Sequence, residues 1–141
     1  MNRNILLLSM FIVFSGCVKE EIIYECEAPI EGKWMLTKVF IGWSETELTG
    51  EDIGYEEYYI FNSDGSFSKT NISEEGSKSV NGIYSEIETT DGNQLKLEYP
   101  EDHELIENCT GDPIEVLTIL TNELKGGSAP CDGPDLYYTP E

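Results

Sequence analysis

The stretch YEEYYIFNSDGSFSKTN, residues 55–71, decides the fold of this chain. Tyr55 to Phe61 is rich in aromatic residues and predicts a strand. Asn62-Ser63-Asp64-Gly65 has the composition of a tight turn, in which Gly65 takes a positive φ without steric cost. Ser66 to Asn71 then returns as the antiparallel partner, so the stretch predicts a β-hairpin.

The same arrangement repeats on both sides of this hairpin. Short runs of β-branched and aromatic residues are separated by Gly, Asn, Asp and Pro, and helical spacing is nowhere sustained. The segment Glu45 to Gly54 is the exception, for which we expect one helical turn over an end of the fold. The other predicted strands are Trp34–Trp43, Val80–Ile87, Gln94–Tyr99, Ile114–Leu120, Leu124–Gly126 and Leu136–Thr139.

About eight antiparallel strands joined by tight turns predict an all-β protein, namely an up-and-down antiparallel β-barrel, because closure of the sheet leaves no exposed edge. Gly126-Gly127, Pro130 and Pro134 interrupt the last strands of this pattern. Two forms therefore stay open, a closed barrel and a flattened or partly open one.

Alternation along the strands predicts which side chains face the barrel interior. The interior set is Trp34, Leu36, Tyr59, Phe61, Phe67, Tyr84, Leu95, Leu97, Val116 and Leu120. A barrel of this size is either filled by its side chains or holds one small ligand. Trp43 and Tyr58 are expected nearer a rim, where a polar-tipped aromatic side chain either faces a ligand or simply stays half exposed to water. The candidate ligand-binding residues are Trp34, Leu36, Trp43, Tyr58, Tyr59, Phe61, Phe67, Tyr84 and Leu97.

The first residues of the chain predict its export. Arg3 precedes an apolar run from Ile5 to Phe14, and two small residues stand before Cys17, which is the layout of a secretory signal. The run is shorter than the ~20 apolar residues that a membrane-spanning helix needs. We therefore expect residues 1–16 to be a cleaved signal peptide.

Ser15-Gly16-Cys17 resembles a bacterial lipobox, which implies cleavage before Cys17 and attachment of acyl chains such as palmitate to it. Lys19-Glu20-Glu21 resembles the export tag of Bacteroidota-type surface lipoproteins, which implies an outer-membrane lipoprotein displayed on the cell surface. Residues 17–29 then form a lipidated acidic tether to a domain of residues 30–141. For Ser15-Gly16-Cys17, the alternative is an ordinary secretory signal cleaved nearby, which leaves Cys17 as a free thiol. For Lys19-Glu20-Glu21, the alternative is a solvated charged linker.

Several motifs in the body of the chain resemble the small bacterial lipocalin-like lipoproteins. Gly32-Lys33-Trp34 matches the Gly-x-Trp signature, and the hairpin of residues 59–67, Gly82-Ile83-Tyr84 and Leu95-Lys96-Leu97 follow in the same order. The resemblance covers about residues 30–139. It implies a barrel with Trp34 packed across its floor and a site for a small apolar molecule inside.

The charge of the chain excludes several partners. Asp and Glu together number 28 against 8 Lys and Arg, which gives a formal net charge of −20. Nucleic acids and anionic lipid headgroups are repelled by such a chain, so we expect no nucleic acid and membrane contact only through the lipid anchor. Asp112, Asp132 and Asp135 lack the alternating oxygen ligands of a calcium loop, and we expect no metal and no cofactor.

With Cys17 lipidated, three cysteines remain in an oxidising compartment, which predicts one disulfide and one free thiol. Cys109 and Cys131 flank the predicted hairpin near Asn122, which favours their pairing. A bridge from Cys26 to Cys131 is the alternative. A zinc site is disfavoured because the sequence has no close cysteine pair.

No catalytic motif is apparent. The only histidine, His103, lies between Asp102 and Glu104 in a charged stretch typical of a surface, so we expect no enzyme activity. Two functions stay open for what we expect to be a monomer. The slightly preferred one is a carrier or sensor of a small apolar ligand, and the other is a non-catalytic accessory module with a solid barrel that binds a protein or glycan partner.

Overall fold

The computed structural model describes residues 29–90 and 92–141. The predictions for the signal peptide, Cys17, the export tag Lys19-Glu20-Glu21, residues 17–28 of the tether and Cys26 lie outside these residues. Within this part, the strands are β1 (Gly32–Ile41), β2 (Thr46–Thr49), β3 (Glu56–Phe61), β4 (Ser66–Ser73), β5 (Gly76–Thr89), β6 (Gly92–Glu98), β7 (Ile114–Leu120), β8 (Glu123–Gly127) and β9 (Asp135–Pro140).

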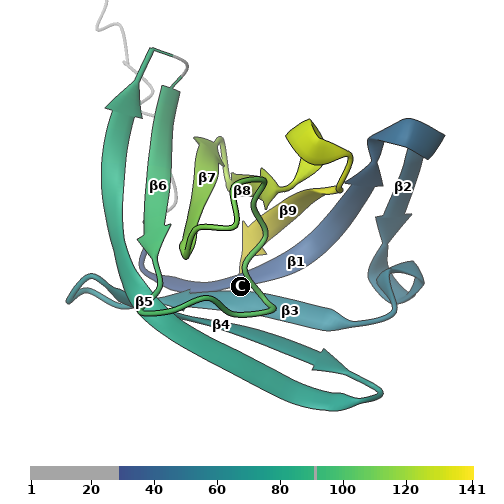
Figure 1. Ribbon diagram of the computed structural model, residues 1–141, viewed down its shortest axis with the longest axis horizontal. Coiled ribbons are helices and arrows are strands. Elements are labelled where there is room, and N and C mark those ends of the chain that lie inside the picture. The colour runs from purple at the N-terminus through teal and green to yellow at the C-terminus, as the bar shows by residue number, and fades with distance from the viewer. Residues whose placement is uncertain (1–28, 91) are drawn as a thin grey trace, which may run out of the picture.

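The strands form a closed barrel (Figure 1). Strand β1 pairs antiparallel with β3, each strand from β3 to β8 pairs antiparallel with the next one along the chain, and β9 pairs back with β1. The eight strands β1 and β3–β9 therefore form the closed ring. β2 pairs with β1 alone within the described residues and is a ninth strand outside the closed ring. The all-β, up-and-down antiparallel barrel is confirmed, in its closed form, and it is compatible with a lipocalin-like fold.

The hairpin that decides the fold forms as its sequence predicts. Strands β3 and β4 pair from Glu56 opposite Ile72 to Phe61 opposite Phe67. Gly65 has a φ of 82° in the turn, and its N–H donates to the carbonyl of Asn62 at 3.1 Å. These turn contacts fix the register of the hairpin, and with it which face of each strand points inward.

A β-bulge at Thr37 lets β1 follow the curvature of the barrel. Leu36 pairs with Tyr138 of β9 and Lys38 pairs with Tyr137, so Thr37 is the extra residue. The bulge changes the parity of the strand, because Trp34 and Leu36 are buried before it and Val39 is buried after it.

The segment Glu45–Gly54 differs from the single helical turn that we expected. It begins with strand β2, which runs back along β1 from Thr46 opposite Ile41 to Thr49 opposite Lys38. The chain reverses through the 3-10 turn η1 (Gly42–Ser44) because Glu45 adopts a left-handed conformation with a φ of 50°. The helical turn is confined to the 3-10 helix η2 (Gly50–Ile53), which follows β2.

The predicted interior set is mostly buried, with two errors on β7. Val116 is 45% exposed and Leu120 is 38% exposed, whereas Glu115 and Leu117 are 2% exposed and point inward. The inward face of β7 is thus the opposite one from the face that we predicted, since successive residues of a strand point to opposite sides. The buried apolar residues are Trp34, Leu36, Val39, Ile53, Tyr59, Phe61, Phe67, Val80, Leu95, Leu97, Tyr99, Leu105, Leu117, Leu124, Leu136 and Tyr138.

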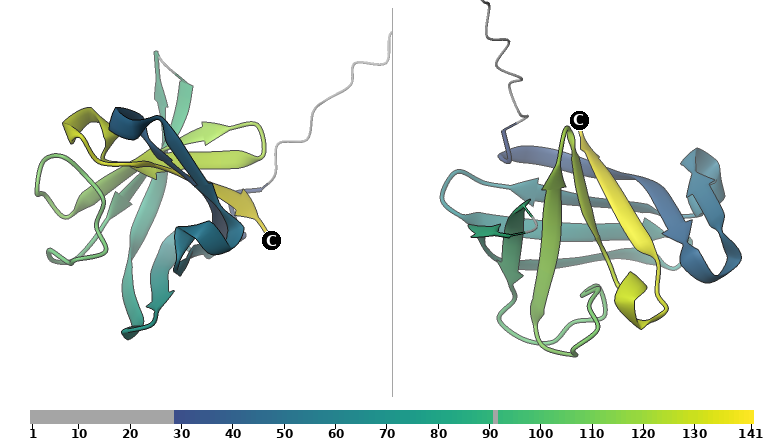
Figure 2. Two further views of the ribbon diagram at one scale, coloured as in Figure 1. Left: turned by 90° about the vertical axis from the view of Figure 1, so that its right-hand side faces the viewer. Right: turned by 90° about the horizontal axis from the view of Figure 1, so that it is seen from above.

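Two ends of the barrel differ in what projects from them. Figures 1 and 2 show that the β1–β2 hairpin and the turn between β4 and β5 extend from the end opposite to the start of β1. The 3-10 segments η1, η2 and η3 (Ala129–Cys131) are short turns. No helix in residues 29–90 and 92–141 is long and apolar enough to cross a membrane.

Candidate functional site

A charged network crosses the middle of the barrel. Lys69 on β4 is fully buried, and its Nζ lies 2.9 Å from Oε1 of Glu115 on β7 and 3.6 Å from Oε1 of Glu57 on β3. The same ammonium donates a hydrogen bond of 2.6 Å to the carbonyl of Leu105. Glu57 and Glu115 are 5% and 2% exposed, so three buried ionisable side chains from three different strands contact one another.

Tyrosine hydroxyls hold both carboxylates in place. The Tyr59 hydroxyl donates to Oε2 of Glu115 at 2.8 Å, and the Tyr99 hydroxyl donates to the same oxygen. The Tyr138 hydroxyl donates to Oε1 of Glu57 at 2.6 Å. Within the described residues, every buried side-chain nitrogen and oxygen has a hydrogen-bond partner. A fully satisfied network of this kind rigidifies a core, because each removed partner would leave a buried group unpaired.

The network keeps its tyrosines protonated. Burial, reinforced by the nearby Glu115 carboxylate, raises the pKa of Tyr59 well above its usual range, and burial together with Glu57 does the same for Tyr138. Burial and Glu115 also raise the pKa of Tyr99. Tyr55, half-buried near Glu57, has its pKa raised to about 12 by burial. The hydroxyls of Tyr59, Tyr99 and Tyr138 therefore remain donors to the carboxylates across the physiological pH range.

Aromatic rings pack next to the charged network. The rings of Tyr59 and Phe61 are stacked with centroids 5.6 Å apart, and Tyr138 meets Tyr59 edge-on at 4.9 Å. Phe67 lies 6.0 Å from Phe61 and meets Tyr99 edge-on at 5.1 Å. These separations are those of directly packed rings, so the side chains themselves occupy the centre of the barrel.

The predicted ligand-binding residues lie partly in the core and partly nearer the surface. Most of them are core residues inside the barrel, namely Trp34, Leu36, Tyr59, Phe61, Phe67 and Leu97. Tyr84 is half-buried, and its hydroxyl donates to the carbonyl of Asn62. Tyr58 is half-buried with the Lys33 ammonium 4.6 Å from its ring centroid. Trp43 lies in η1 and is 81% exposed.

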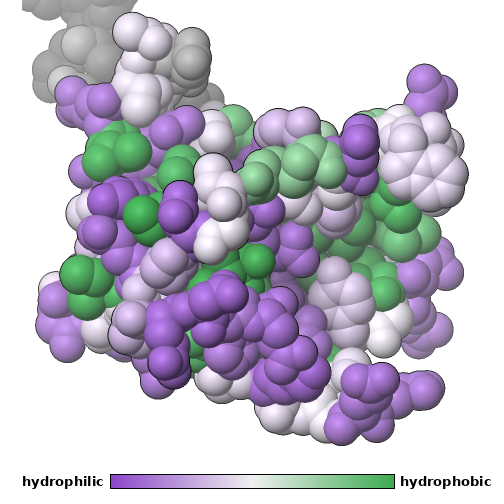
Figure 3. Space-filling view, viewed as in Figure 1, coloured by the Kyte–Doolittle hydropathy of each residue, from purple (hydrophilic) through white to green (hydrophobic). Residues whose placement is uncertain are grey.

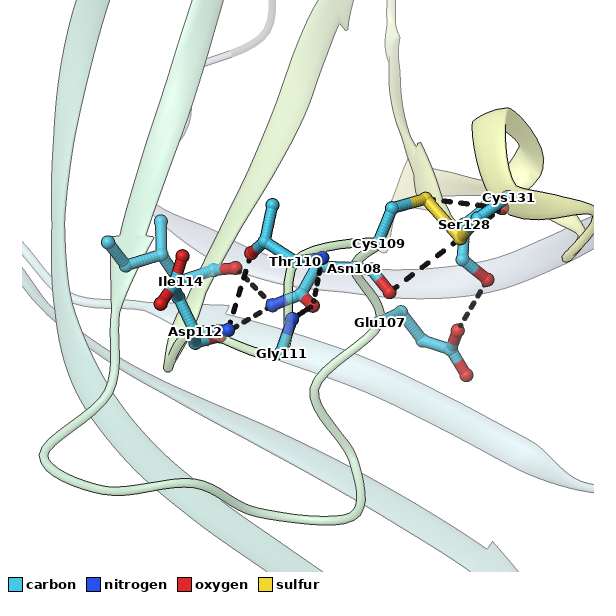
Figure 4. The surroundings of a disulfide bond; sticks show 9 residues. All are labelled: Glu107, Asn108, Cys109, Thr110, Gly111, Asp112, Ile114, Ser128 and Cys131. Atoms are coloured by element: carbon cyan, nitrogen blue, oxygen red, sulfur yellow. Dashed lines mark hydrogen bonds between the residues drawn. A yellow bond between two sulfur atoms is a disulfide. The ribbon is translucent and has the colours of Figure 1, made fainter.

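The connection between β6 and β7, residues 99–113, is fastened to the barrel from within and from outside. Inside, Leu105 is buried and its carbonyl accepts from Lys69, while the N–H of Glu107 donates to Glu115. Outside, Cys109 is bonded to Cys131 of η3, with Cα atoms 5.7 Å apart (Figure 4). The disulfide predicted between these two cysteines is thus present, and it joins the connection to the β8–β9 loop.

Asn108 shapes the turn beside this disulfide. Its Nδ2 donates to the carbonyls of Asp112 and Ile114, and its Oδ1 accepts from the N–H of Gly111 at 2.9 Å (Figure 4). Hydrophilic side chains cover the front of the molecule in Figure 3, in the region where Figure 1 draws this connection. The residues around the bridge therefore serve the folding of a polar surface loop.

Hollows open on the barrel among the described residues. One of about 410 Å³ lies where β5 and β6 meet and is lined by Asn81, Gly82, Ile83, Glu98, Tyr99 and Pro100. A second, of about 220 Å³, lies beside Trp34 near the start of β1, and a third, of about 370 Å³, lies beside the disulfide. The first has the most apolar lining, because Ile83 and Pro100 face it and Gly82 contributes no side chain.

The sequence analysis missed the three charged residues at the centre. The signal was present, because Glu57 alternates with Tyr59 and Phe61, Lys69 follows Phe67 by two, and Glu115 precedes Leu117 by two. Strict alternation places all three on the inward faces of their strands. Their charge argues against an inward position, because charged residues are seldom buried unless they are paired.

Metal ligation finds no support in the geometry. Among the described residues, no group of three His, Cys, Asp or Glu side chains is arranged to hold a metal ion. Asp112, Asp132 and Asp135, considered above for calcium, are included in that part of the chain.

Comparison with known proteins adds no relative: no family model, no curated protein and no solved structure matches the chain. The resemblance to lipocalins therefore rests on the sequence motifs and on the closed barrel with which they agree.

Proposed function

We propose that this protein is a lipid-anchored, non-catalytic binding module of the cell surface whose barrel is solid and which meets a protein or glycan partner through its outer surface. The observation that carries this proposal is the buried Lys69–Glu115 ion pair with Glu57 beside it. It spans the space in which an internal ligand would lie.

Of the two functions that the sequence left open, the accessory module with a solid barrel is the less favoured one. The contacts inside the barrel support it. An apolar ligand entering the centre would have to displace Lys69 or Tyr59 from hydrogen bonds that they make in the absence of water. Removing one partner of a buried ion pair leaves an uncompensated charge at a cost of about 3–5 kcal/mol, which few small apolar molecules recover. The rings of Phe61 and Phe67 occupy the adjoining space.

The surface location is argued from the sequence. Cys17 ends the lipobox-like segment, and Lys19-Glu20-Glu21 has the composition of an export tag. The net charge of −20 keeps the exposed surface solvated and favours partners that are not strongly acidic. A domain tethered in this way acts where it is displayed, as a receptor component or an accessory subunit.

A second candidate function, the carrier of a small apolar ligand, is favoured by one observation. The hollow of about 410 Å³ beside Ile83, Tyr99 and Pro100 lies within the size range of small-molecule pockets. Ile83 is 61% exposed at its edge. If the protein is such a carrier, the ligand would bind on the outer surface of the barrel and not among the side chains that it encloses.

Native mass spectrometry separates the two candidates. The full chain, purified in mild detergent from an oxidising compartment, is offered extracts of apolar small molecules. The proposal predicts the bare mass of the lipidated polypeptide under every condition. A discrete added mass that survives Ile83→Ser would contradict the solid barrel, whereas an added mass abolished by Ile83→Ser would support the carrier function on the outer wall.

The anchor and the surface location have their own test. Radiolabelled palmitate should enter the native protein and be absent from the Cys17→Ser variant. Protease added to intact cells should digest the native protein, and replacement of Lys19, Glu20 and Glu21 by Ala should protect it. Labelling of the Cys17→Ser variant, or protease resistance of the native protein, would contradict the proposed location.

A further inference from the structure

Strand β2 has an open edge. It pairs with β1 from Thr46 opposite Ile41 to Thr49 opposite Lys38. Its other edge has no strand partner along its whole length among residues 29–90 and 92–141. Residues 76–82 of β5 also pair on one side alone, with β4, because the pairing of β5 with β6 begins at Ile83. An open edge presents unpaired N–H and C=O groups that can pair with an added extended segment.

An exposed tryptophan stands directly before this edge. Trp43 lies in η1, between β1 and β2, and is 81% exposed, which is the largest exposure among the large hydrophobic side chains of the described residues. Nothing in the barrel uses its ring. Tryptophan is enriched among the residues that dominate binding energy at protein interfaces, and its face attracts lysine and arginine side chains.

The surroundings of the edge are rich in negative charge. Lys38 of β1, opposite Thr49, is the lysine of the paired part of this hairpin, and its ammonium lies 3.9 Å from the ring centroid of Tyr137. Glu45, Glu47, Glu51 and Asp52 lie in β2 or next to it, and none of them forms an ion pair within the described part of the chain. The sequence contains no lysine or arginine between Lys38 and Lys69. By contrast, Lys33, Lys78, Lys96 and Lys125 each pair with a carboxylate.

The position of the hairpin argues for a protein partner. Strand β1 begins at one end of the barrel and the β1–β2 hairpin lies at the other (Figures 1 and 2). Ten residues of extended chain span roughly 33 Å. In a protein anchored through residues before β1, the hairpin therefore points away from the lipid, and the negative charge beside it would repel an anionic membrane surface.

We infer that the β1–β2 hairpin is a docking arm, and that its partner is an extended segment of another protein that carries lysine or arginine side chains. This inference rests on the proposed function and names the site and partner chemistry for it. The segment adds to the open edge of β2 through backbone hydrogen bonds. One of its cationic side chains lies over the Trp43 ring, and others pair with Glu45 and Glu47.

The test uses the full chain and a defined probe, a decapeptide of alternating lysine and valine, with the matching glutamate–valine decapeptide as a comparison. Binding is followed by the fluorescence of Trp43, whose emission should shift to shorter wavelength, since Trp34 is buried already. Amide hydrogen exchange locates the contact. The basic peptide should slow exchange over residues 45–50, and the acidic peptide should leave it unchanged.

Variants decide whether the arm is the site. Trp43→Ser and the double variant Glu45→Gln, Glu47→Gln should each weaken binding of the basic peptide at least tenfold, as measured by the hydrogen-exchange titration. The control is Glu74→Gln, Glu75→Gln, an exposed acidic pair next to the start of β5. This control should stay within twofold of the native affinity, because no exposed aromatic side chain lies on the β4–β5 hairpin, whereas Trp43 lies on the β1–β2 hairpin.

Three results would overturn the inference. They are equal binding of the two peptides, protection that maps outside residues 43–50, and native affinity in the Trp43→Ser variant. Any of these leaves the solid barrel standing, because that part of the account is judged by native mass spectrometry. An internal ligand found by that method would overturn the proposed function whatever the peptides do.

Discussion

Replacing Lys69 by methionine should be the most damaging single change in the barrel. The side chain is 0% exposed, and its ammonium lies 2.9 Å from Glu115 and 3.6 Å from Glu57. Methionine is unbranched and keeps the apolar stem of the lysine side chain, but it lacks the ammonium group and its charge. Two buried carboxylates then face each other without a cation, and the carbonyl of Leu105 loses its donor. We expect a loss of about 3–5 kcal/mol in the free energy of unfolding.

Urea denaturation of the full chain, with the disulfide intact, measures this loss. The matched control is Lys78→Met, which removes a lysine that pairs with Glu104 at 2.8 Å on the surface. Exposed pairs contribute at most about 1 kcal/mol, so the control should remain close to the native protein. A Lys69→Met variant that loses no more stability than Lys78→Met would refute the claim that the buried charged network stabilises the barrel.

Further predictions concern the packing of Gly82 in β5, the disulfide and the buried tyrosines. Gly82→Ala should destabilise the barrel by about 1–3 kcal/mol in urea denaturation, since a new Cβ would lie 2.6 Å from the Phe67 ring. The control Gly42→Ala should have no such effect, because nothing lies within 4 Å of a Cβ added there. Equal effects of the two substitutions would contradict the close packing of Gly82 against Phe67. Removing the bridge with Cys109→Ala and Cys131→Ala should cost about 3 kcal/mol, measured as a lower urea midpoint, and an unchanged midpoint would contradict it. Because the buried tyrosines have raised pKa values, their contribution to the free energy of unfolding should be complete below about pH 10 and lost as the pH rises above it. Absorbance at 295 nm should show the ionisation of these tyrosines only together with unfolding.

Much of the fold could be predicted from local chemistry, because hairpins such as β3–β4 carry their own turn signal. Residues 62–65 fix the β3–β4 turn, and Ile114–Leu120 coincides with the predicted strand at both ends. Closure could not be predicted, because it depends on pairing between β1 and β9, which are far apart in the sequence. Strand β2 was missed because four residues are too few to show alternation, and its existence depends on the reversal at Glu45.

The candidate site was harder to predict than the fold. The alternation that places Tyr59 and Phe67 inside also places Glu57 and Lys69 inside, but their charges suggested a solvated face. Burial became favourable only through partners on other strands, such as Glu115 on β7. Pairing between strands that are distant in the chain cannot be deduced from the spacing of residues in one sequence.

The central claim, that side chains fill the barrel, is tested most directly by a crystal of the protein under xenon pressure, because xenon occupies apolar cavities that hold no ordered water. The account predicts no xenon among Tyr59, Phe61, Phe67 and Tyr138, whose rings are in contact. Xenon bound on the outer wall beside Ile83 would agree with the account. A xenon site enclosed by those four rings would show a hollow barrel and contradict it.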